Sequence, residues 1–215
     1  MRTIPLERCG ALVWIADGAD PQQRASTAIR LDAGVLLVDA VDAPGLDELL
    51  APLGRVIGVC TLLDRHRRDC GAVARRHGCP LYVPSTLAGR GEPLDLAGVQ
   101  ERAILAAPGW NESALWLPER RLLVCADALG TTGWFRAADD DPIGVHPLLR
   151  PRPPRGALGG LDPEAVCVGH GAPLATRAGA AVEQALRTAR SGLPRAWLRA
   201  ARLTAAALGQ RPRSR

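Results

Sequence analysis

The sequence contains no lysine, since all 27 of its basic residues are arginine. Aromatic side chains make up only 3% of the chain, with five Trp, one Tyr and one Phe. A core must therefore be built from Leu, Val, Ile and Ala. No apolar run approaches the roughly 20 residues that a membrane-spanning helix needs, and no apolar export signal follows Met1. We therefore expect a cytoplasmic protein that does not enter a membrane.

The arrangement of the arginines argues against a nucleic-acid partner. A formal charge of +5 would suit an acidic partner. A nucleic-acid footprint, however, needs clustered basic residues interleaved with stacking aromatics. The arginines are scattered instead, and the abundance of Ala, Gly and Pro indicates a compositional bias. We expect a small-molecule ligand, and the sequence carries no signal of an oligomeric state.

The six cysteines form no Cys-x-x-Cys pair and no zinc-ribbon spacing. In a reducing compartment such residues act as small apolar fillers. Cys60, Cys125 and Cys167 fit this interpretation because they lie in or beside runs rich in Val and Leu.

Length and patterning predict a layered α/β protein. A chain of 215 residues with 47% hydrophobic content can bury a substantial single core. Strand-rich halves that each carry helices predict sheets packed face to face with helices outside. We expect one domain over residues 1–192, followed by a C-terminal helix and basic tail over 193–215, and a long irregular excursion over 130–160. The strands are expected at 11–15, 27–31, 35–38, 56–61, 81–83, 102–106, 113–117, 122–125 and 165–168, and the helices at 44–50, 72–78, 178–190 and 196–208.

Three strand ends carry side chains that could perform chemistry. They are Asp64-Arg65-His66-Arg67-Arg68-Asp69-Cys70, Ala126-Asp127 and Gly169-His170-Gly171. Loops beyond the carboxyl ends of strands are where such folds place ligands, so we expect these segments to meet at one cleft. A hydrolytic metal centre needs His and carboxylate ligands that converge from several strands.

The order of these segments resembles the metallo-β-lactamase fold superfamily. Its pattern is a strand ending in Thr-His-x-His-x-Asp-His-x-Gly, a Pro-Gly-His segment, a strand ending in Gly-Asp and a final Gly-His-Gly. The corresponding segments here are Leu63 to Gly71, Pro108-Gly109-Trp110, Ala126-Asp127 and Gly169-His170-Gly171. The resemblance implies the four-layer αββα sandwich of that superfamily.

Carried over without a gap, the resemblance implies a degenerate metal site. This site would hold at most one zinc or other divalent ion. The ligands that the resemblance implies are Asp64, His66, Asp69, Asp127 and His170. The resemblance also implies that Asp127 or Asp69 accepts a proton during catalysis. Trp110 stands where a ligand histidine is expected, and its indole binds no cation.

Arg68 makes a metal-free arrangement an alternative. It occupies a ligand position, and two cations at contact distance repel by roughly 4 kcal/mol at an effective dielectric constant of 20. A guanidinium clamped between Asp69 and Asp127 would then replace the ion. Sliding the alignment by one residue gives a third arrangement, a zinc site of Asp69, Cys70 and His170.

These alternatives lead to two hypotheses about function. The first is a hydrolase of ester, thioester or lactone substrates, as the resemblance implies. The second is a catalytically silent relative that binds a small molecule or a protein through Arg68, Trp110 and Trp134. We expect His146, within the irregular excursion, to be an exposed loop residue.

Overall fold

A seven-stranded sheet forms one half of the molecule. A computed structural model describes residues 1–16 and 22–209 of the chain. The strands follow one another across this sheet in sequence order, antiparallel from β1 to β4 and parallel from β4 to β7. They span β1 Arg2–Leu6, β2 Ala11–Ile15, β3 Ala25–Leu31, β4 Gly34–Val38, β5 Val56–Cys60, β6 Leu81–Val83 and β7 Glu92–Pro93.

A second, four-stranded sheet has the order β13-β10-β9-β8. The edge strand β13 runs parallel to β10, whereas β9 pairs antiparallel with both β8 and β10. The strands of this sheet and of a separate short pair, β11 with β12, span β8 Gln100–Ala107, β9 Trp110–Leu117, β10 Leu122–Val124, β11 Leu129–Gly130, β12 Gly144–Val145 and β13 Ala165–Cys167.

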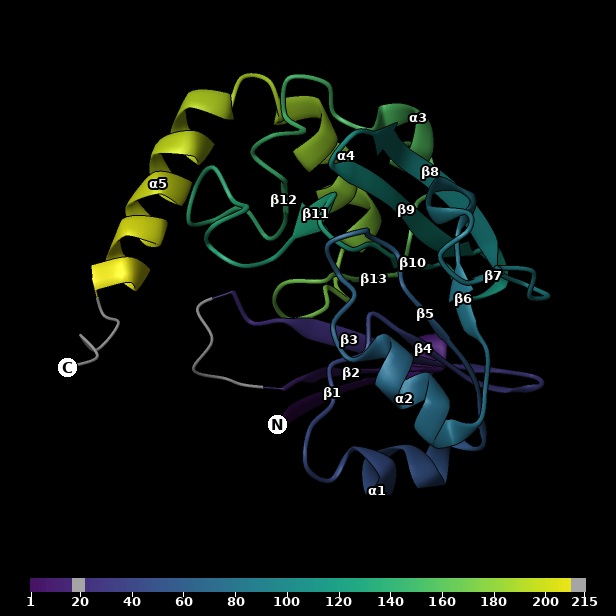
Figure 1. The fold of residues 1–215 in the computed structure, drawn as a ribbon. Coiled ribbons are helices and arrows are strands. Elements are labelled where there is room, and N and C mark those ends of the chain that lie inside the picture. The colour runs from purple at the N-terminus through teal and green to yellow at the C-terminus, as the bar shows by residue number, and fades with distance from the viewer. Residues whose placement is uncertain (17–21, 210–215) are drawn as a thin grey trace.

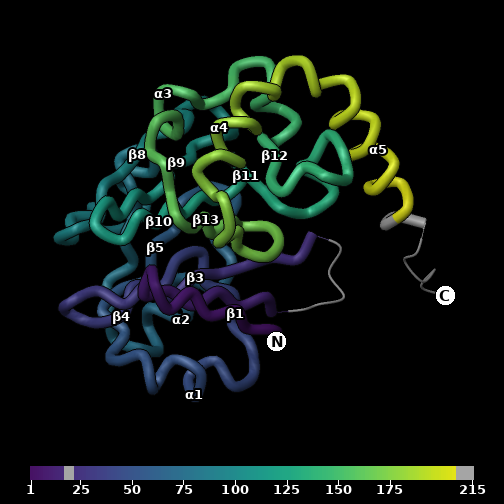
Figure 2. Tube along the Cα trace, turned by 180° about the vertical axis from the view of Figure 1, so that it is seen from behind, coloured from purple at the N-terminus to yellow at the C-terminus, as the bar shows by residue number. Residues whose placement is uncertain are grey.

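Helices cover the outer faces of the two sheets (Figures 1 and 2). Helices α1 and α2 lie on the first sheet, α3 and α4 lie beside the second, and α5 extends along the flank of the molecule (Figure 1). The helices span α1 Leu46–Leu50, α2 Cys70–His77, α3 Arg155–Leu158, α4 Ala178–Thr188 and α5 Leu193–Gly209, with 3-10 turns η1 Glu7–Cys9, η2 Ala51–Leu53, η3 Ser85–Leu87 and η4 Pro118–Arg120.

The first sheet contributes apolar side chains to a layer on each of its two faces. In β2, Leu12 and Trp14 pack with residues of α1 and α2, whereas Val13 and Ile15 pack in the cluster that contains the second sheet. Successive side chains of a strand point to opposite faces, so one strand feeds both layers. The expected αββα sandwich is therefore confirmed.

Most predicted elements are present, with shifted ends. The hairpin is formed by β3 and β4, and the strand at 81–83 is β6. The helix expected to start at residue 72 starts at Cys70. Within the irregular excursion the structure adds β12 and α3. Of the expected basic tail, residues 210–215 lie outside the described part of the chain.

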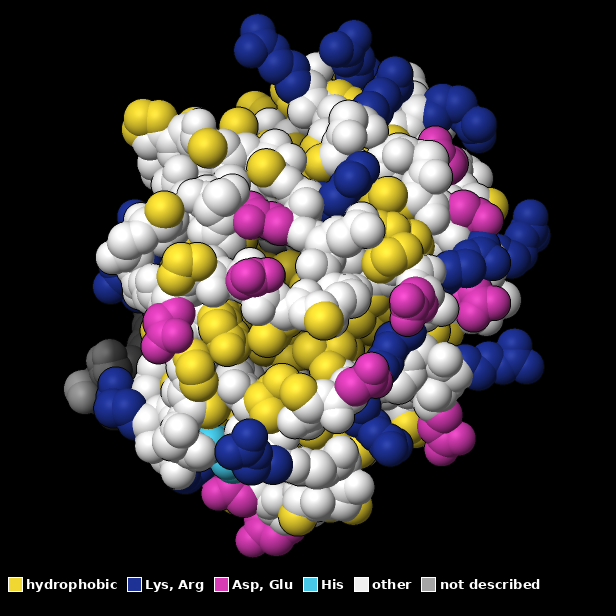
Figure 3. All heavy atoms as spheres, turned by 90° about the vertical axis from the view of Figure 1, so that its right-hand side faces the viewer, with side chains coloured by type: hydrophobic (Ala, Val, Ile, Leu, Met, Phe, Trp, Pro, Cys, Tyr) yellow, Lys and Arg dark blue, Asp and Glu magenta, His cyan; other side chains and the backbone are white. Residues whose placement is uncertain are grey.

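Arginines and acidic residues alternate over the face shown in Figure 3, around a central band of hydrophobic side chains. Among residues 1–16 and 22–209, no helix combines the length and the apolar character needed to cross a lipid bilayer.

Candidate metal centre

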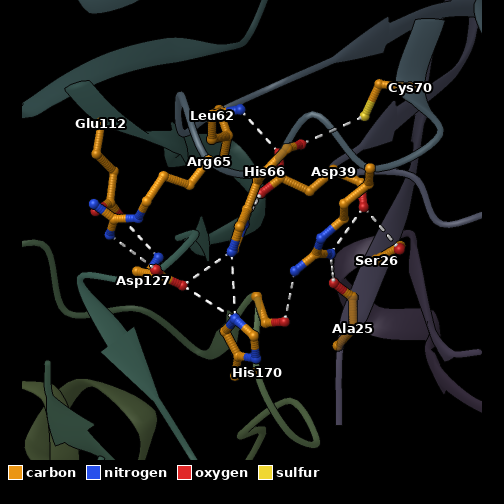
Figure 4. Close-up of polar contacts among 12 residues, drawn as sticks. Ala25, Ser26, Asp39, Leu62, Arg65, His66, Cys70, Glu112, Asp127 and His170 are labelled. Atoms are coloured by element: carbon orange, nitrogen blue, oxygen red, sulfur yellow. Dashed lines mark hydrogen bonds and ion pairs between the residues drawn. The ribbon is translucent and has the colours of Figure 1, made fainter. Parts of the chain in front are cut away.

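Three side chains from separate strand ends converge at one point. His66 follows β5, Asp127 follows β10 and His170 follows β13. Asp127 Oδ1 lies 3.0 Å from His66 Nε2 and 3.2 Å from His170 Nε2, and the two Nε2 atoms lie 3.3 Å apart. Figure 4 shows the three side chains pointing toward one another. No other group of three His, Cys, Asp or Glu residues in the described ranges brings its ligand atoms together in this way.

Backbone hydrogen bonds between the two sheets hold this point in place. The loop after β5 joins the second sheet through the N–H of Ser113, which donates to Leu62 O at 3.0 Å. The segment after β13 joins the first sheet because the N–H of Ala25 donates to Gly169 O at 2.9 Å. The carboxyl ends of β5, β10 and β13 are thus held at a shared edge.

The outer nitrogen of each histidine has an acceptor as its partner. His66 Nδ1 lies 2.9 Å from Asp39 Oδ2, and His170 Nδ1 lies 3.0 Å from the carbonyl oxygen of Gln22. A carboxylate and a carbonyl can only accept, so each Nδ1 carries the hydrogen. In the neutral form of each ring, Nε2 would then present its lone pair toward Asp127, and outer partners of this kind fix the tautomer of metal-binding histidines.

The cluster shifts the pKa values of its own members. Burial and the charge of Arg68 would lower the pKa of His66, but the carboxylates of Asp39 and Asp127 outweigh them and raise it above its ordinary value. Burial alone would raise the pKa of Asp127, but contacts with His170 and His66 hold it well below its usual range. Asp127 Oδ1 is nevertheless buried without a hydrogen bond of good geometry from the described residues. A cation bound between the three side chains would give this oxygen a partner.

A second buried carboxylate, Glu112, supports Asp127 from behind. Its Oε1 accepts the N–H groups of Asp127 at 2.9 Å and Ala128 at 2.7 Å, and its Oε2 accepts Trp110 Nε1 at 2.8 Å. Burial, together with the charge of Asp127, raises the pKa of Glu112 to about 7. Glu112 thus fixes the turn that carries Asp127.

The cluster lies in a cleft of about 380 Å³, a size that suits a small molecule. Arg65 lies at its wall, where Nη2 is 3.3 Å from Asp127 Oδ2 and the guanidinium carbon is 4.2 Å above the Trp110 ring. The lining consists of Gln22, Arg24, Arg65, His66, Arg68, Asp127, Thr132, Trp134, Phe135, His146 and His170.

Arg68 lines the cleft but does not form the expected clamp. Its Nη1 donates to Ala25 O and to Asp39 O, the latter at 2.9 Å, and its Nη2 donates to Gly169 O at 2.9 Å. Its backbone lies in the left-handed region at φ 41°. This turn directs the guanidinium to backbone carbonyls, so neither Asp69 nor Asp127 pairs with it.

The remaining predicted ligands lie outside the cluster. Asp64 Oδ2 accepts both the backbone N–H and the side-chain Nδ2 of Asn111, each at 3.0 Å. Asp69 precedes α2, and its Oδ2 accepts the N–H of Asp42 at 2.9 Å. The Cys70 thiol is buried against Ala40 O, and burial raises its pKa to about 12. Asp64, Asp69 and Cys70 therefore do not lie in the cluster of His66, Asp127 and His170. Asp69, which was also a candidate proton acceptor, is directed away from this cluster.

The aromatic residues take different positions. Trp134 lines the cleft as a candidate for substrate binding, whereas Trp110 is buried behind Arg65 and contributes its ring face to that arginine. His146 is buried, so the expectation of an exposed loop residue is wrong. It packs edge to face against Trp110 and Trp134, and burial lowers its pKa to about 4.

Sequence reasoning missed the residues that position the cluster. Asp39 follows the apolar strand β4, so a polar residue at a strand end was the available signal. Glu112 lies inside β9 among buried residues, and a carboxylate at a buried strand position is a comparable signal. Neither signal identifies a partner without the pairing of the strands.

Comparisons with known proteins bear on the fold. No protein-family model matches the sequence, and a search of curated proteins gives no match. Among solved structures, a metallo-β-lactamase from Erythrobacter litoralis has a TM-score of 0.55 at 11% identity, covering 88% of this chain and 92% of that one. DIM-1 metallo-β-lactamase has a TM-score of 0.53 at 14% identity, covering 87% and 97%. TTHA1623, in a di-iron-bound form, has a TM-score of 0.53 at 20% identity, covering 78% and 97%.

At identities this low, the structural similarity establishes a shared fold only. The chemistry must be inferred from the residues of the site. The two sheets, the outer helices and the breadth of the alignments agree with one another. Over the residues that the structure describes, the chain has the metallo-β-lactamase fold.

Proposed function

We propose that this chain is a metal-dependent hydrolase that holds a single divalent ion between His66, Asp127 and His170. The observation that carries the proposal is the convergence of two imidazole Nε2 atoms on a buried carboxylate oxygen, with separations of 3.0 to 3.3 Å. Ligands about 2 Å from a tetrahedral zinc ion lie about 3.3 Å apart, so the spacing fits.

The donor set also fits a catalytic rather than a structural ion. Structural zinc sites use four protein ligands, whereas three protein ligands are typical of catalytic sites. A divalent ion held there would supply Lewis-acid activation of water and of the bond to be cleaved. Since Asp64 and Asp69 bind Asn111 and Asp42, the described residues favour one ion.

The residues of the cleft would orient the substrate and move the proton. Among the described residues that line the cleft, Asp127 carries the carboxylate, so it is our candidate proton acceptor. Arg65 Nη2 donates to its Oδ2 and orients it. Leu148 N–H donates to His146 Nδ1 at 3.1 Å, so the neutral ring carries its hydrogen on Nε2 as a donor. Ester, thioester or lactone substrates are proposed from the resemblance of the fold.

A catalytically silent binding protein is the second candidate function, because charged and aromatic side chains line the cleft and could bind a ligand without a metal. Arg68, Trp134 and Phe135 line it and could hold a small molecule by charge and stacking. Metal uptake separates the two functions.

We expect purified protein to take up about one equivalent of zinc, iron or manganese, measured by elemental analysis after gel filtration. His170→Ala should lose most of this metal because it removes one of three ligands. The matched control is His77→Ala, since His77 pairs with Asp47 on the surface near α1. Equal, substoichiometric metal in all three proteins would contradict the hydrolase and favour the silent binder.

A further inference from the structure

The positive charge of this chain is concentrated at its C-terminus. Residues 193–215 contain six arginines and no Asp or Glu, whereas the preceding 192 residues carry 21 arginines against 22 acidic residues. Within this segment, Arg199 pairs with Asp139. Arg195 and Arg202 are exposed, and neither forms an ion pair with the described residues. An excess of one sign that is confined to one segment indicates a partner of the opposite charge.

Large apolar side chains are exposed on the same helix and on the loop beside it. Leu198 of α5 is 54% exposed, Trp197 of α5 is 52% exposed, and Leu148 of the loop is 62% exposed. The loop and the helix are joined because Trp197 Nε1 donates to Pro147 O at 3.0 Å. Apolar residues scattered singly over a surface need no explanation, but a cluster of large ones marks an interaction site.

The spacing of residues along α5 places this apolar surface on the outward side of the helix. Ala196 and Ala200, four residues apart, are buried against the molecule. Leu198, Ala201 and Ala205 are exposed at positions i, i+3 and i+7, so they form a stripe on another side of the helix. In Figures 1 and 2, α5 lies at the flank of the molecule with no other described element outside it. The described residues therefore leave this stripe uncovered.

Two exposed arginines border the apolar stripe. Arg195 precedes Leu198 by three residues and Arg202 follows it by four, so both lie about one helical turn from it. An apolar face that carries tryptophan and is bordered by arginine is typical of helices that lie in the plane of a bilayer surface. The apolar side chains of such a helix enter the boundary of the acyl chains, while its long basic side chains reach the anionic headgroups.

We propose that α5 docks this protein on the surface of an anionic lipid bilayer. The helix would lie on the surface and not cross it, because its 17 residues include three arginines and a spanning helix needs roughly 20 apolar residues. A second copy of the chain suits this face less well, because two paired α5 helices would bring their exposed arginines together. An acidic peptide would pair with the arginines but offers no apolar surface to Trp197 and Leu198. The inference does not depend on the proposed hydrolase.

Vesicle flotation with the full-length protein tests this inference. The probes are vesicles of phosphatidylcholine mixed with an equal amount of phosphatidylglycerol, and vesicles of phosphatidylcholine alone as the neutral control. We expect the protein to float with the anionic vesicles only, and added salt to weaken the binding because it screens the headgroup charge. Tryptophan fluorescence should shift to shorter wavelength through Trp197, which is exposed, whereas Trp14, Trp110 and Trp116 are buried. Equal flotation with both kinds of vesicle, or none, would overturn the inference.

A charge variant tests the role of the two arginines. The double variant Arg195→Gln/Arg202→Gln should bind the anionic vesicles about 30-fold more weakly, because each basic residue near such a surface contributes about fivefold. The matched control is Arg75→Gln/Arg90→Gln, which removes the same charge from exposed positions outside α5. The affinity of the control should stay within about twofold of the parent protein. Equal losses in the two double variants would mean that net charge alone attracts the vesicles, and would overturn the inference.

An apolar variant separates docking by α5 from simple electrostatic attraction. Leu198→Ser should weaken binding to the anionic vesicles about fivefold, because it removes an apolar side chain that enters the bilayer. Leu198→Met keeps an apolar side chain at this exposed position and should bind like the parent protein. Unchanged binding of Leu198→Ser would overturn the inference.

Two further measurements identify a different occupant of this face. Binding of polyglutamate without binding of anionic vesicles would overturn the inference and point to an acidic protein partner. A dimer in gel filtration that Leu198→Ser dissociates, again without vesicle binding, would identify a second copy of the chain as the occupant and would likewise overturn it.

Discussion

Single buried carboxylates, rather than the ligands alone, determine the chemistry of this cluster. Asp39 accepts His66 Nδ1 through Oδ2 and the N–H of Leu62 through Oδ1, each at 2.9 Å. Asp39 therefore fixes both the orientation of the His66 ring and the start of the loop that carries this histidine. Glu112 does the same for Asp127 through two backbone N–H groups. Supporting groups of this kind raise metal affinity because they fix the ligand geometry before binding.

Glu112 predicts a pH dependence of stability in the metal-free protein. Its folded pKa of about 7 lies above its ordinary value of 4.5. Between these values the unfolded chain loses a proton that the folded chain keeps, so rising pH favours unfolding. The stabilising contribution is complete below about 4.5 and is lost as the pH rises toward 7, by at most about 3 kcal/mol.

Denaturant unfolding of the parent protein and of Glu112→Gln across this pH range measures that loss. The stability difference between the two proteins should change by up to about 3 kcal/mol as the pH rises. The variant also loses an acceptor for Trp110 Nε1, which adds a cost of about 1–3 kcal/mol at every pH. Glu119→Gln, at an exposed position after β9, should show no such trend. A difference that stays constant with pH for Glu112→Gln would contradict the prediction.

At the scale of elements, the close approach of β10 and β13 brings the ligands together. The N–H of Gly169 donates to Ala126 O at 2.9 Å, which continues the pairing of these strands past their ends. A Cβ atom at position 169 would lie 2.7 Å from Ala126 O and 2.7 Å from His66 Cε1. Real side chains do not approach so closely, so only glycine fits between these groups.

Gly169→Ala should therefore disturb the ion site without removing a ligand. We expect metal affinity, measured by competition with a chelator, to fall at least about tenfold and stability to fall by about 1–3 kcal/mol from overpacking. Gly156→Ala is the matched control, because a Cβ there meets nothing within 4 Å and the residue lies in helix α3. It should leave metal affinity unchanged and stabilise the chain by up to about 1 kcal/mol. Parent-like metal affinity in Gly169→Ala would refute this account of the junction.

The elements were easier to predict than the ligands because they follow from local pattern. Apolar runs at β5, β10 and β13, and the sandwich they imply, are visible in the sequence. The loop after β5 is different, because its path depends on tertiary hydrogen bonds. Aligned without a gap, it offers both Asp64 and Asp69, but the folded loop directs Asp64 to Asn111 and Asp69 to Asp42.

At the scale of the whole molecule, α5 braces the loop that supplies one side of the cleft. Arg199 Nε donates to Gly133 O at 2.8 Å, and Arg199 also pairs with Asp139. Trp197 Nε1 donates to Pro147 O at 3.0 Å. The segment between these contacts contains Trp134 and His146, both of which line the cleft. We propose that α5 supports the cleft wall from outside and is not a separate C-terminal appendage.

Removing one of these contacts should loosen the wall without touching the ion site. In Arg199→Ala we expect faster hydrogen exchange at the amides of residues 132–146 and a rise in KM or ligand Kd, with metal stoichiometry unchanged. The physical reason is that local opening becomes easier when few buried contacts hold a segment. Arg202→Ala is the control, since Arg202 is exposed on the same helix and forms no hydrogen bond or ion pair with the described residues. Identical exchange rates in the two variants would mean that the loop holds its position without α5. Faster exchange with an unchanged Kd would mean that the wall does not contribute to binding.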